Sequence, residues 1–124
     1  MVPVATTLLI VDDHAGFRGF ARRLMEAEGL VVVGEAADGP SAITETARLD
    51  PDVVLLDVML PGLDGFEVCE RLFATRANRP AVVLTSSRDR SSYADRMARS
   101  AARGFIAKHA LSGQTLTALL EVGA

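Results

Sequence analysis

Cysteine is almost absent from the sequence: Cys69 is the only one, so no disulfide can form within a single copy of the chain. No apolar stretch approaches the roughly 18 residues that cross a bilayer, and no basic segment precedes an apolar block at the N-terminus, as in a secretory signal. These absences predict a cytoplasmic protein without membrane contact. The chain has 124 residues, of which 49% are apolar and 23% charged, so we expect one globular domain over residues 1–124.

Lysine is equally scarce, because twelve of the 13 basic residues are arginine and only Lys108 is lysine. The formal net charge is −3, which argues against nucleic-acid contact by this domain. Residues 1–79 hold 7 basic and 13 acidic side chains, whereas residues 80–124 hold 6 basic and 3 acidic ones. The single lysine therefore stands out as a candidate functional residue.

Short apolar runs alternate along the chain with segments of helical periodicity. A continuous apolar run is typical of a strand that is buried on both faces. The predicted strands are residues 7–11, 31–33, 53–56, 81–84 and 105–107. The first predicted helix contains Phe17, Phe20, Ala21 and Leu24 and stops at Gly29. The second has Gly39 as its N-cap and Pro40 as its first residue, and the third starts with a capping box of Asp64 and Glu67. Two more are predicted over 89–101 and 111–122. This alternation predicts an α/β fold with right-handed βαβ units and a doubly wound, five-stranded parallel sheet.

Polar residues stand at the ends of four predicted strands. They are Asp12 and Asp13, Asp57, Thr85, and Lys108. The carboxyl ends of parallel strands meet at one edge of the sheet, which is where such folds bind ligands. Each residue alone has an ordinary structural interpretation, such as a helix cap or a loop side chain. Their shared position at one edge instead favours a common site.

The chemistry of such a group can be worked out from its members. Three carboxylates in one crevice repel each other and raise at least one pKa, and a divalent cation such as Mg²⁺ relieves that repulsion. A carboxylate can also attack phosphorus to give an aspartyl phosphate. That reaction needs a cation, a lysine and a hydroxyl to stabilise the moving phosphoryl group. The group at this edge contains every protein side chain that the reaction requires.

Four motifs occur in order along the chain, namely residues 10–13, residues 55–62 with Asp64-Gly65, residues 84–86 and residues 104–108. With them the sequence resembles the response-regulator receiver domains of bacterial two-component signal transduction, over essentially its whole length. The resemblance implies a (βα)5 flavodoxin-like receiver fold with strand order 2-1-3-4-5. It also implies a phosphoprotein of a phosphorelay, whose partner is a sensor histidine kinase or a phosphotransfer protein. Segments 12–18 and 33–39 are similar to receivers that carry helix-turn-helix output domains.

The resemblance also assigns roles at the site. Asp57 is the implied phosphate acceptor. Asp13, Asp57 and the backbone carbonyl of Met59 are the implied direct ligands of Mg²⁺, and Asp12 is implied to bind it largely through water. The domain is then a signalling switch that catalyses only its own phosphorylation and dephosphorylation, and not an enzyme acting on other substrates.

Further roles concern the phosphoryl oxygens and the switch. Thr85 and Lys108 are implied to contact the phosphoryl group, and Phe105 stands where the family has a rotating aromatic switch residue. Partner binding, including formation of a homodimer, is implied for the face of helix 4, strand 5 and helix 5. One departure is His109, because the family usually has a proline after the active-site lysine.

Two other functions remain open at this point. An aspartyl-phosphate phosphatase would use a second acid two residues after the nucleophile, where this chain has Met59. A receiver-like scaffold that works without phosphorylation is the other alternative. His14 could serve in phosphate relay or metal binding, although we expect it to cap or flank the first helix. Cys69 is expected to be a core or boundary residue.

The predicted fourth helix suggests an arginine-rich docking surface. On a helical projection Arg88, Arg96, Arg99 and Arg103 share one side, next to Phe105. On the opposite side, Ala94, Met97, Ala98 and Ala101 are expected to pack on the sheet. The arginines could bind an acidic partner or a second copy of the chain, or they could simply form a solvated face.

Overall fold

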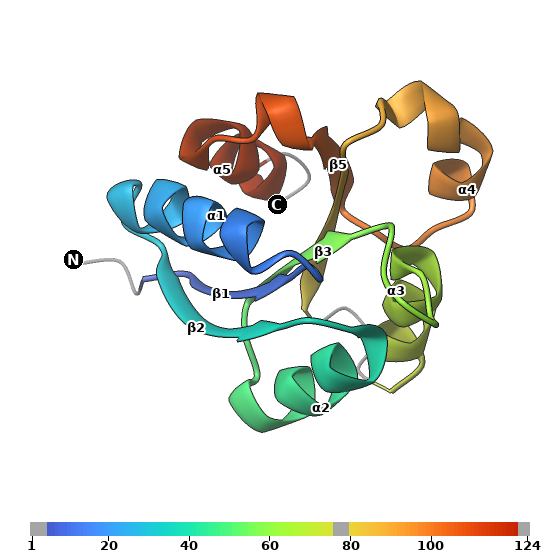
Figure 1. Ribbon diagram of the computed structural model, residues 1–124, viewed down its shortest axis with the longest axis horizontal. Helices are drawn as coiled ribbons and strands as arrows, with labels where there is room; N and C mark the ends of the chain where they lie inside the picture. Colours follow the sequence, from blue (N-terminus) through green and yellow to red (C-terminus); the bar gives the residue numbers. More distant parts are fainter. Residues whose placement is uncertain (1–4, 76–79, 122–124) are drawn as a thin grey trace.

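The computed structural model describes residues 5–75 and 80–121, which form an α/β fold around one parallel sheet (Figure 1). The strands are β1 (Thr7–Val11), β2 (Val31–Ala36), β3 (Val53–Asp57), β4 (Ala81–Ser86) and β5 (Gly104–Ala107). Their order in the sheet is β2-β1-β3-β4-β5, with every neighbouring pair parallel. The predicted fold class and strand order are therefore confirmed.

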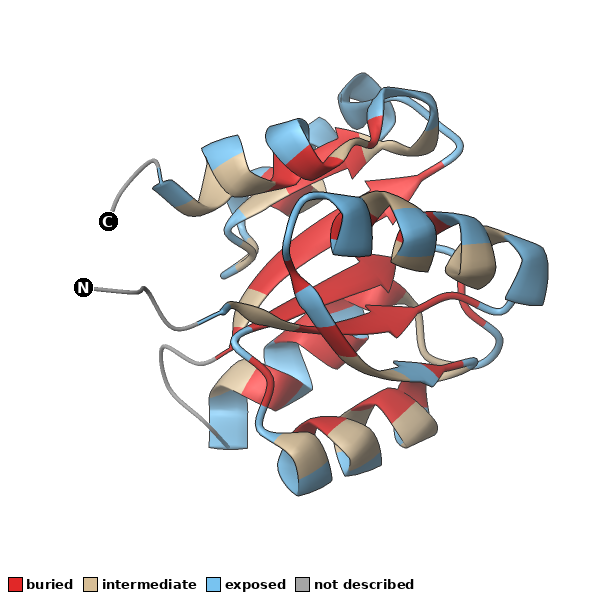
Figure 2. Ribbon diagram, turned by 90° about the vertical axis from the view of Figure 1, so that its left-hand side faces the viewer, coloured by how far each residue is buried: buried red, intermediate tan, exposed pale blue. Residues whose placement is uncertain are grey.

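Helices cover both faces of the sheet. They are α1 (Ala15–Ala27), α2 (Gly39–Leu49), α3 (Gly65–Thr75), α4 (Ala94–Ala98) and α5 (Gly113–Glu121), with 3-10 turns over Arg90–Tyr93 and Lys108–Ala110. One core cluster joins the sheet to α1 and α5, and the other joins it to α2, α3 and α4. Figure 2 shows the buried strands enclosed between these helical layers. No helix in the described ranges is both long and apolar enough to cross a membrane.

The central strands carry the core. Every residue of β3 is buried, and alternate residues of β1 enter opposite clusters: Leu8 and Ile10 on the α1 and α5 side, and Leu9 and Val11 on the other. A strand buried on both faces needs apolar side chains at every position. This burial explains why the runs in the sequence are continuous.

Two predicted helix starts lie beside the carboxyl edge of the sheet. In the capping box of α3, Glu67 N donates to Asp64 Oδ1 at 3.0 Å, and Asp64 N donates to Glu67 Oε1 at 3.3 Å. At α2 the capping residue is Asp38, which accepts from Ser41 N at 2.8 Å, so the predicted cap at Gly39 is wrong by one residue. A Cβ atom at Gly65 would collide with the Asp57 carbonyl oxygen, so glycine lets α3 start directly against the end of β3.

The helix predicted over residues 89–101 is wrong in its length, and of its four predicted inward residues only Met97 is confirmed as buried. A 3-10 turn first directs Tyr93 into the core, where its ring lies 5.8 Å from that of Phe66. Only a short α4 follows, in which Met97, four residues after Tyr93, is buried. A tyrosine and a methionine bury far more apolar surface than alanines do. They therefore set the helix phase and leave exposed the predicted inward residues Ala94, Ala98 and Ala101.

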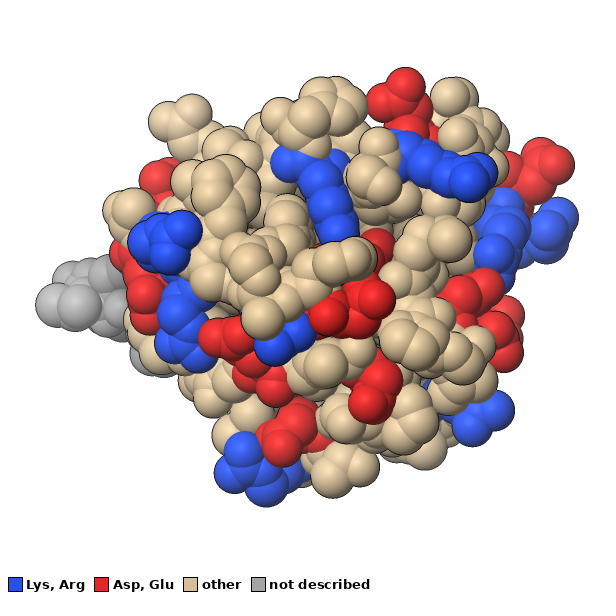
Figure 3. Space-filling model, in the orientation of Figure 1, with Lys and Arg blue, Asp and Glu red and all other residues tan. Residues whose placement is uncertain are grey.

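The predicted stripe of four arginines does not form. Arg88 precedes the 3-10 turn, and Arg103 lies after α4, with its backbone N–H donating to Val82 O. Arg96 is engaged within the chain, because its Nη2 lies 2.7 Å from Asp64 Oδ2 and its guanidinium stacks 4.3 Å from the centre of the Phe66 ring. Figure 3 shows Lys and Arg side chains interspersed with Asp and Glu rather than segregated on the visible face.

Candidate functional site

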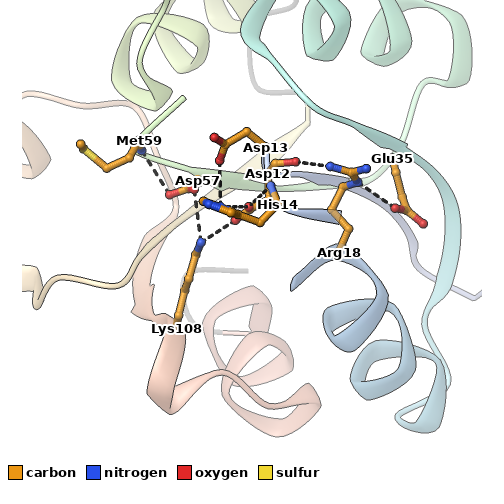
Figure 4. Close-up of polar contacts among 8 residues, drawn as sticks. All are labelled: Asp12, Asp13, His14, Arg18, Glu35, Asp57, Met59 and Lys108. Carbon is orange, nitrogen blue, oxygen red and sulfur yellow. Dashed lines mark hydrogen bonds and ion pairs between the residues drawn. The ribbon is translucent and has the colours of Figure 1, made fainter. Parts of the chain in front are cut away.

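The strand-end residues predicted from the sequence converge at the carboxyl edge of the sheet. Asp12 follows β1, Asp57 is the last residue of β3, and Lys108 follows β5. Thr85 lies in β4 directly beside Asp57 in the parallel register. Figure 4 shows Asp12, Asp13, Asp57 and Lys108 pointing toward one another from these separate segments.

Lys108 joins the two buried carboxylates. Its Nζ lies 2.6 Å from Asp12 Oδ2 and 3.3 Å from Asp57 Oδ2, while its side chain is 19% exposed. The same ammonium lies 4.4 Å from the centre of the Phe17 ring, a distance at which a cation and an aromatic face attract each other. The lone lysine of the sequence is therefore held within the acidic group.

The surroundings of Asp57 disfavour the ionised form of its carboxyl group. Its side chain is 3% exposed, and Oδ1 accepts a hydrogen bond from Met59 N at 3.1 Å. Burial and the charge of Asp12 raise the pKa of Asp57 to about 6, against the opposing effects of Met59 N–H and Lys108. Burial also acts to raise the pKa of Asp12, but hydrogen bonds from Lys108 and from His14 N–H keep that pKa below its ordinary value. The pKa values of two carboxylates of the same site are thus shifted in opposite directions.

Asp13 and His14 lie at the open side of the group. The Asp13 side chain is 33% exposed, and its Oδ1 lies 3.0 Å from His14 Nδ1. His14 is the residue before α1, as expected for a capping or flanking position, but its side chain makes no capping hydrogen bond in the described part of the chain. The ring instead faces Asp13 and Asp12, with Nδ1 3.3 Å from Asp12 Oδ1.

Thr85 supplies an unused hydroxyl beside Asp57. It is fully buried, and its Oγ1 has no hydrogen-bond partner among the described residues. A buried polar group without a partner is costly, so this hydroxyl is well suited to a ligand that enters the site. Phe105, the predicted switch residue, is buried on β5 with its ring 5.9 Å from that of Tyr93. Cys69 is buried on α3, as expected for a core residue.

The residues at this edge fit a divalent cation. Burial and then the nearby charge of Asp12 disfavour the ionised form of Asp57 and raise its pKa, and a hard cation with carboxylate ligands offsets both effects. Asp12, Asp13 and Asp57 can contribute oxygens to such a site, together with the backbone carbonyl of Met59. Met59 is 56% exposed, and its backbone N–H donates to Asp57 Oδ1, so its backbone is the part that lies at the site.

The structure adds residues to which sequence reasoning gave no role. Arg18 contacts the Asp12 backbone and Glu35, and Phe17 lies against Lys108. Both belong to segments noted as motifs, yet nothing in the sequence indicates that a side chain of α1 reaches the end of β2. Such pairs are formed by tertiary contact and not by local spacing.

Comparison with known proteins gives consistent matches. A family model described as the response regulator receiver domain matches residues 8–121. The response regulator GacA of Pseudomonas aeruginosa is 35% identical over 116 residues, covering 93% of this chain and 54% of GacA. A protein-glutamate methylesterase/protein-glutamine glutaminase of Anaeromyxobacter dehalogenans is 48% identical over 80 residues, which cover 64% of this chain and 23% of that protein. The chain thus spans about half of GacA and a smaller part of the methylesterase.

A solved structure is similar over nearly its full length. The signal receiver domain of NarL from Mycobacterium tuberculosis superimposes with a TM-score of 0.84 and 30% sequence identity, covering 96% of both chains.

Proposed function

This chain belongs to the response regulator receiver domain family, and we propose that it accepts a phosphoryl group on Asp57 in a Mg²⁺-dependent reaction. The donor is the phosphohistidine of a sensor histidine kinase or of a phosphotransfer protein. One observation carries the proposal: Asp57 is buried, its pKa is raised to about 6, and Lys108 Nζ and the unpartnered Thr85 hydroxyl are placed beside it. Each of these groups has a part in transferring a phosphoryl group to a carboxylate.

In the transfer step, a carboxylate oxygen of Asp57 forms a bond to phosphorus while the bond from phosphorus to the donor nitrogen breaks. The electron pair of the broken bond stays on the donor nitrogen, which takes up a proton from water, and the phosphoryl group reaches Asp57 with its three oxygens retained. Lys108 moves its ammonium from the carboxylates to the phosphoryl oxygens, and the Thr85 hydroxyl donates a hydrogen bond to one of them. Asp13, Asp57 and the Met59 carbonyl would hold Mg²⁺, with Asp12 nearby, and the cation would supply positive charge against the developing negative charge.

The switch follows from the position of Thr85. When the Thr85 hydroxyl moves toward the phosphoryl group, it leaves space that the ring of Phe105, on the adjacent strand β5, can enter. Phe105 also lines an apolar groove on the surface of β5 and α5, together with Ala107, Ala110 and Leu119. Movement of this ring therefore alters the α4–β5–α5 face, and with it the affinity for a partner protein or a second copy of the chain. We propose residues 1–124 as one receiver unit of this kind.

The alternative of an aspartyl-phosphate phosphatase has less support. At the position where such an enzyme needs a second acid, the Met59 side chain offers no titratable group and is turned toward solvent. We therefore treat the domain as a switch that acts on its own phosphoryl group.

Intact-mass measurement after incubation with acetyl phosphate and Mg²⁺ tests the proposal. We expect one added phosphoryl group in the wild type, and none when the metal is chelated or in Asp57→Asn. Asp95→Asn, an exposed aspartate on α4, is the matched control and should be modified as the wild type is. Equal modification of Asp57→Asn, or turnover of a phosphomonoester by the unmodified chain, would contradict the proposal.

A further inference from the structure

Arg18 connects the acidic group to β2. From the first turns of α1, its Nη1 donates to the backbone carbonyl of Asp12 at 2.6 Å, and its Nε donates to Glu35 Oε1 at 2.9 Å (Figure 4). The side chain is 18% exposed. We propose that Arg18 is a positioning residue for the divalent-cation site, because it fixes the Asp12–Asp13 segment so that both carboxylates face Asp57. This inference rests on the proposed function, since it concerns the same cation.

The contacts of Asp12 show why one bond to its carbonyl matters. Its N–H donates to Ala36 O at 3.0 Å and continues the pairing with β2, whereas its carbonyl lies beyond the end of β1. Its carboxylate is held on both sides, by His14 N at 2.8 Å and by Lys108 Nζ at 2.6 Å. The bond from Arg18 fixes the remaining backbone group. The peptide plane held by that bond leads directly into Asp13, so Arg18 sets the direction in which the next carboxylate points.

Arg18 is itself held by its surroundings. Glu35 accepts from Arg18 Nε through Oε1 and from Arg22 Nε through Oε2, the latter at 3.0 Å. The planar guanidinium lets Arg18 bond to Asp12 and Glu35 in two fixed directions at once. A lysine could keep the charge but could not reproduce both bonds. Arg22 also bonds to Glu35. Within the described ranges, the hydrogen bonds and ion pairs of Arg22 go to Glu35 and Glu26, and none goes to the acidic group.

Positioning and simple electrostatics predict opposite results at Arg18. A positive charge near a cation site repels the cation, so loss of that charge alone should strengthen Mg²⁺ binding. Loss of an outer partner that orients the ligands should instead weaken binding, typically by about 10- to 100-fold in metal sites. The sign of the change therefore separates the two roles.

The test is a calorimetric Mg²⁺ titration of the full chain at constant ionic strength. We expect Arg18→Met to bind Mg²⁺ about tenfold more weakly than the wild type, and Arg18→Lys to recover part of the loss. Arg22→Met is the matched control, because it also removes a bond to Glu35, and its affinity should be unchanged. Unchanged or tighter binding by Arg18→Met would overturn the inference, and so would an equal loss in Arg22→Met.

Folding and function are checked alongside these titrations. Far-UV circular dichroism and urea unfolding establish that each variant is folded under the titration conditions. If Arg18→Met does not fold, Glu35→Gln replaces it in the titration, because that change weakens the hold on Arg18 without removing the arginine. Glu35→Gln should still weaken Mg²⁺ binding, and an unchanged affinity would overturn the inference. A wild-type chain that binds no Mg²⁺ would refute the proposed function itself, whereas normal wild-type binding with no effect at Arg18 refutes only the positioning role.

Discussion

Replacing Asp57 by asparagine should stabilise the metal-free protein, although it removes the proposed acceptor. Asp57 is almost fully buried, and its charge is opposed by burial and by Asp12. Asparagine has nearly the same shape, can still accept the hydrogen bond from Met59 N, and carries no charge. The variant therefore lacks the ionised side chain that the folded state disfavours.

The size of the effect follows from the pKa of Asp57. Folding raises this pKa from 3.8 to about 6, and each unit is worth about 1.4 kcal/mol. At pH 7 the ionised carboxylate thus costs the folded state about 3 kcal/mol, which Asp57→Asn should recover. Because the folded state holds this proton more tightly than the unfolded state, the cost is full above pH 6. It shrinks as the pH falls, and it is gone below about pH 4.

Urea unfolding followed by far-UV circular dichroism is the suitable assay, because the chain has no tryptophan and one tyrosine. The free energy of unfolding of Asp57→Asn should exceed that of the wild type by about 3 kcal/mol at pH 7 in the absence of metal. The difference should close between pH 6 and pH 4. Carboxylates that do not contact Asp57 titrate alike in both proteins, so their contributions cancel in the difference, whereas Asp12 interacts with Asp57 directly. Asp95→Asn serves as control and should change the stability little.

Saturating Mg²⁺ should reverse this order, since a cation that binds only the folded wild type adds stability. If metal-free Asp57→Asn is no more stable than the wild type at pH 7, or if the difference does not depend on pH, the account of opposed charges at Asp57 is wrong.

Two further predictions concern the cation and the α3–α4 contact. In calorimetry, Asp13→Asn should weaken Mg²⁺ binding more than Asp12→Asn does, because Asp13 is the expected direct ligand while Asp12 is fully buried against Lys108. Equal Mg²⁺ affinities of the two variants would reject this ranking of the ligands. Arg96→Glu should lower the free energy of unfolding by about 1 kcal/mol, the scale of a partly exposed ion pair, because it breaks the 2.7 Å pair with Asp64. Arg99→Glu, at an exposed position, should leave the free energy of unfolding unchanged. Phosphorylation at Asp57 should survive both arginine changes, and equal stability of these two variants would contradict the assigned contact.

The sequence by itself determined the sheet and the polar residues that stand at the ends of its strands. Short continuous apolar runs are typical of strands buried on both faces, and the capping box of Asp64 and Glu67 is closed by bonds over three residues. Parallel strands put their carboxyl ends at one edge, so the sequence alone groups Asp57, Thr85 and Lys108 there. These conclusions depend on local periodicity and on chain topology, both of which are readable in the sequence.

Only the tertiary structure decided how these residues are paired and where helical periodicity gives way. Tyr93 packs beside Phe66 and, with the buried Met97, sets the phase of α4. The three alanines that local spacing placed on the same inward side as Met97 are exposed. Lys108 lies nearer to Asp12 than to Asp57, and Arg18 spans to Glu35 across 17 positions of sequence. Such choices depend on distances between separate elements after they pack, and on burial that shifts the pKa values of neighbouring carboxylates. A pattern within one segment contains no information about either.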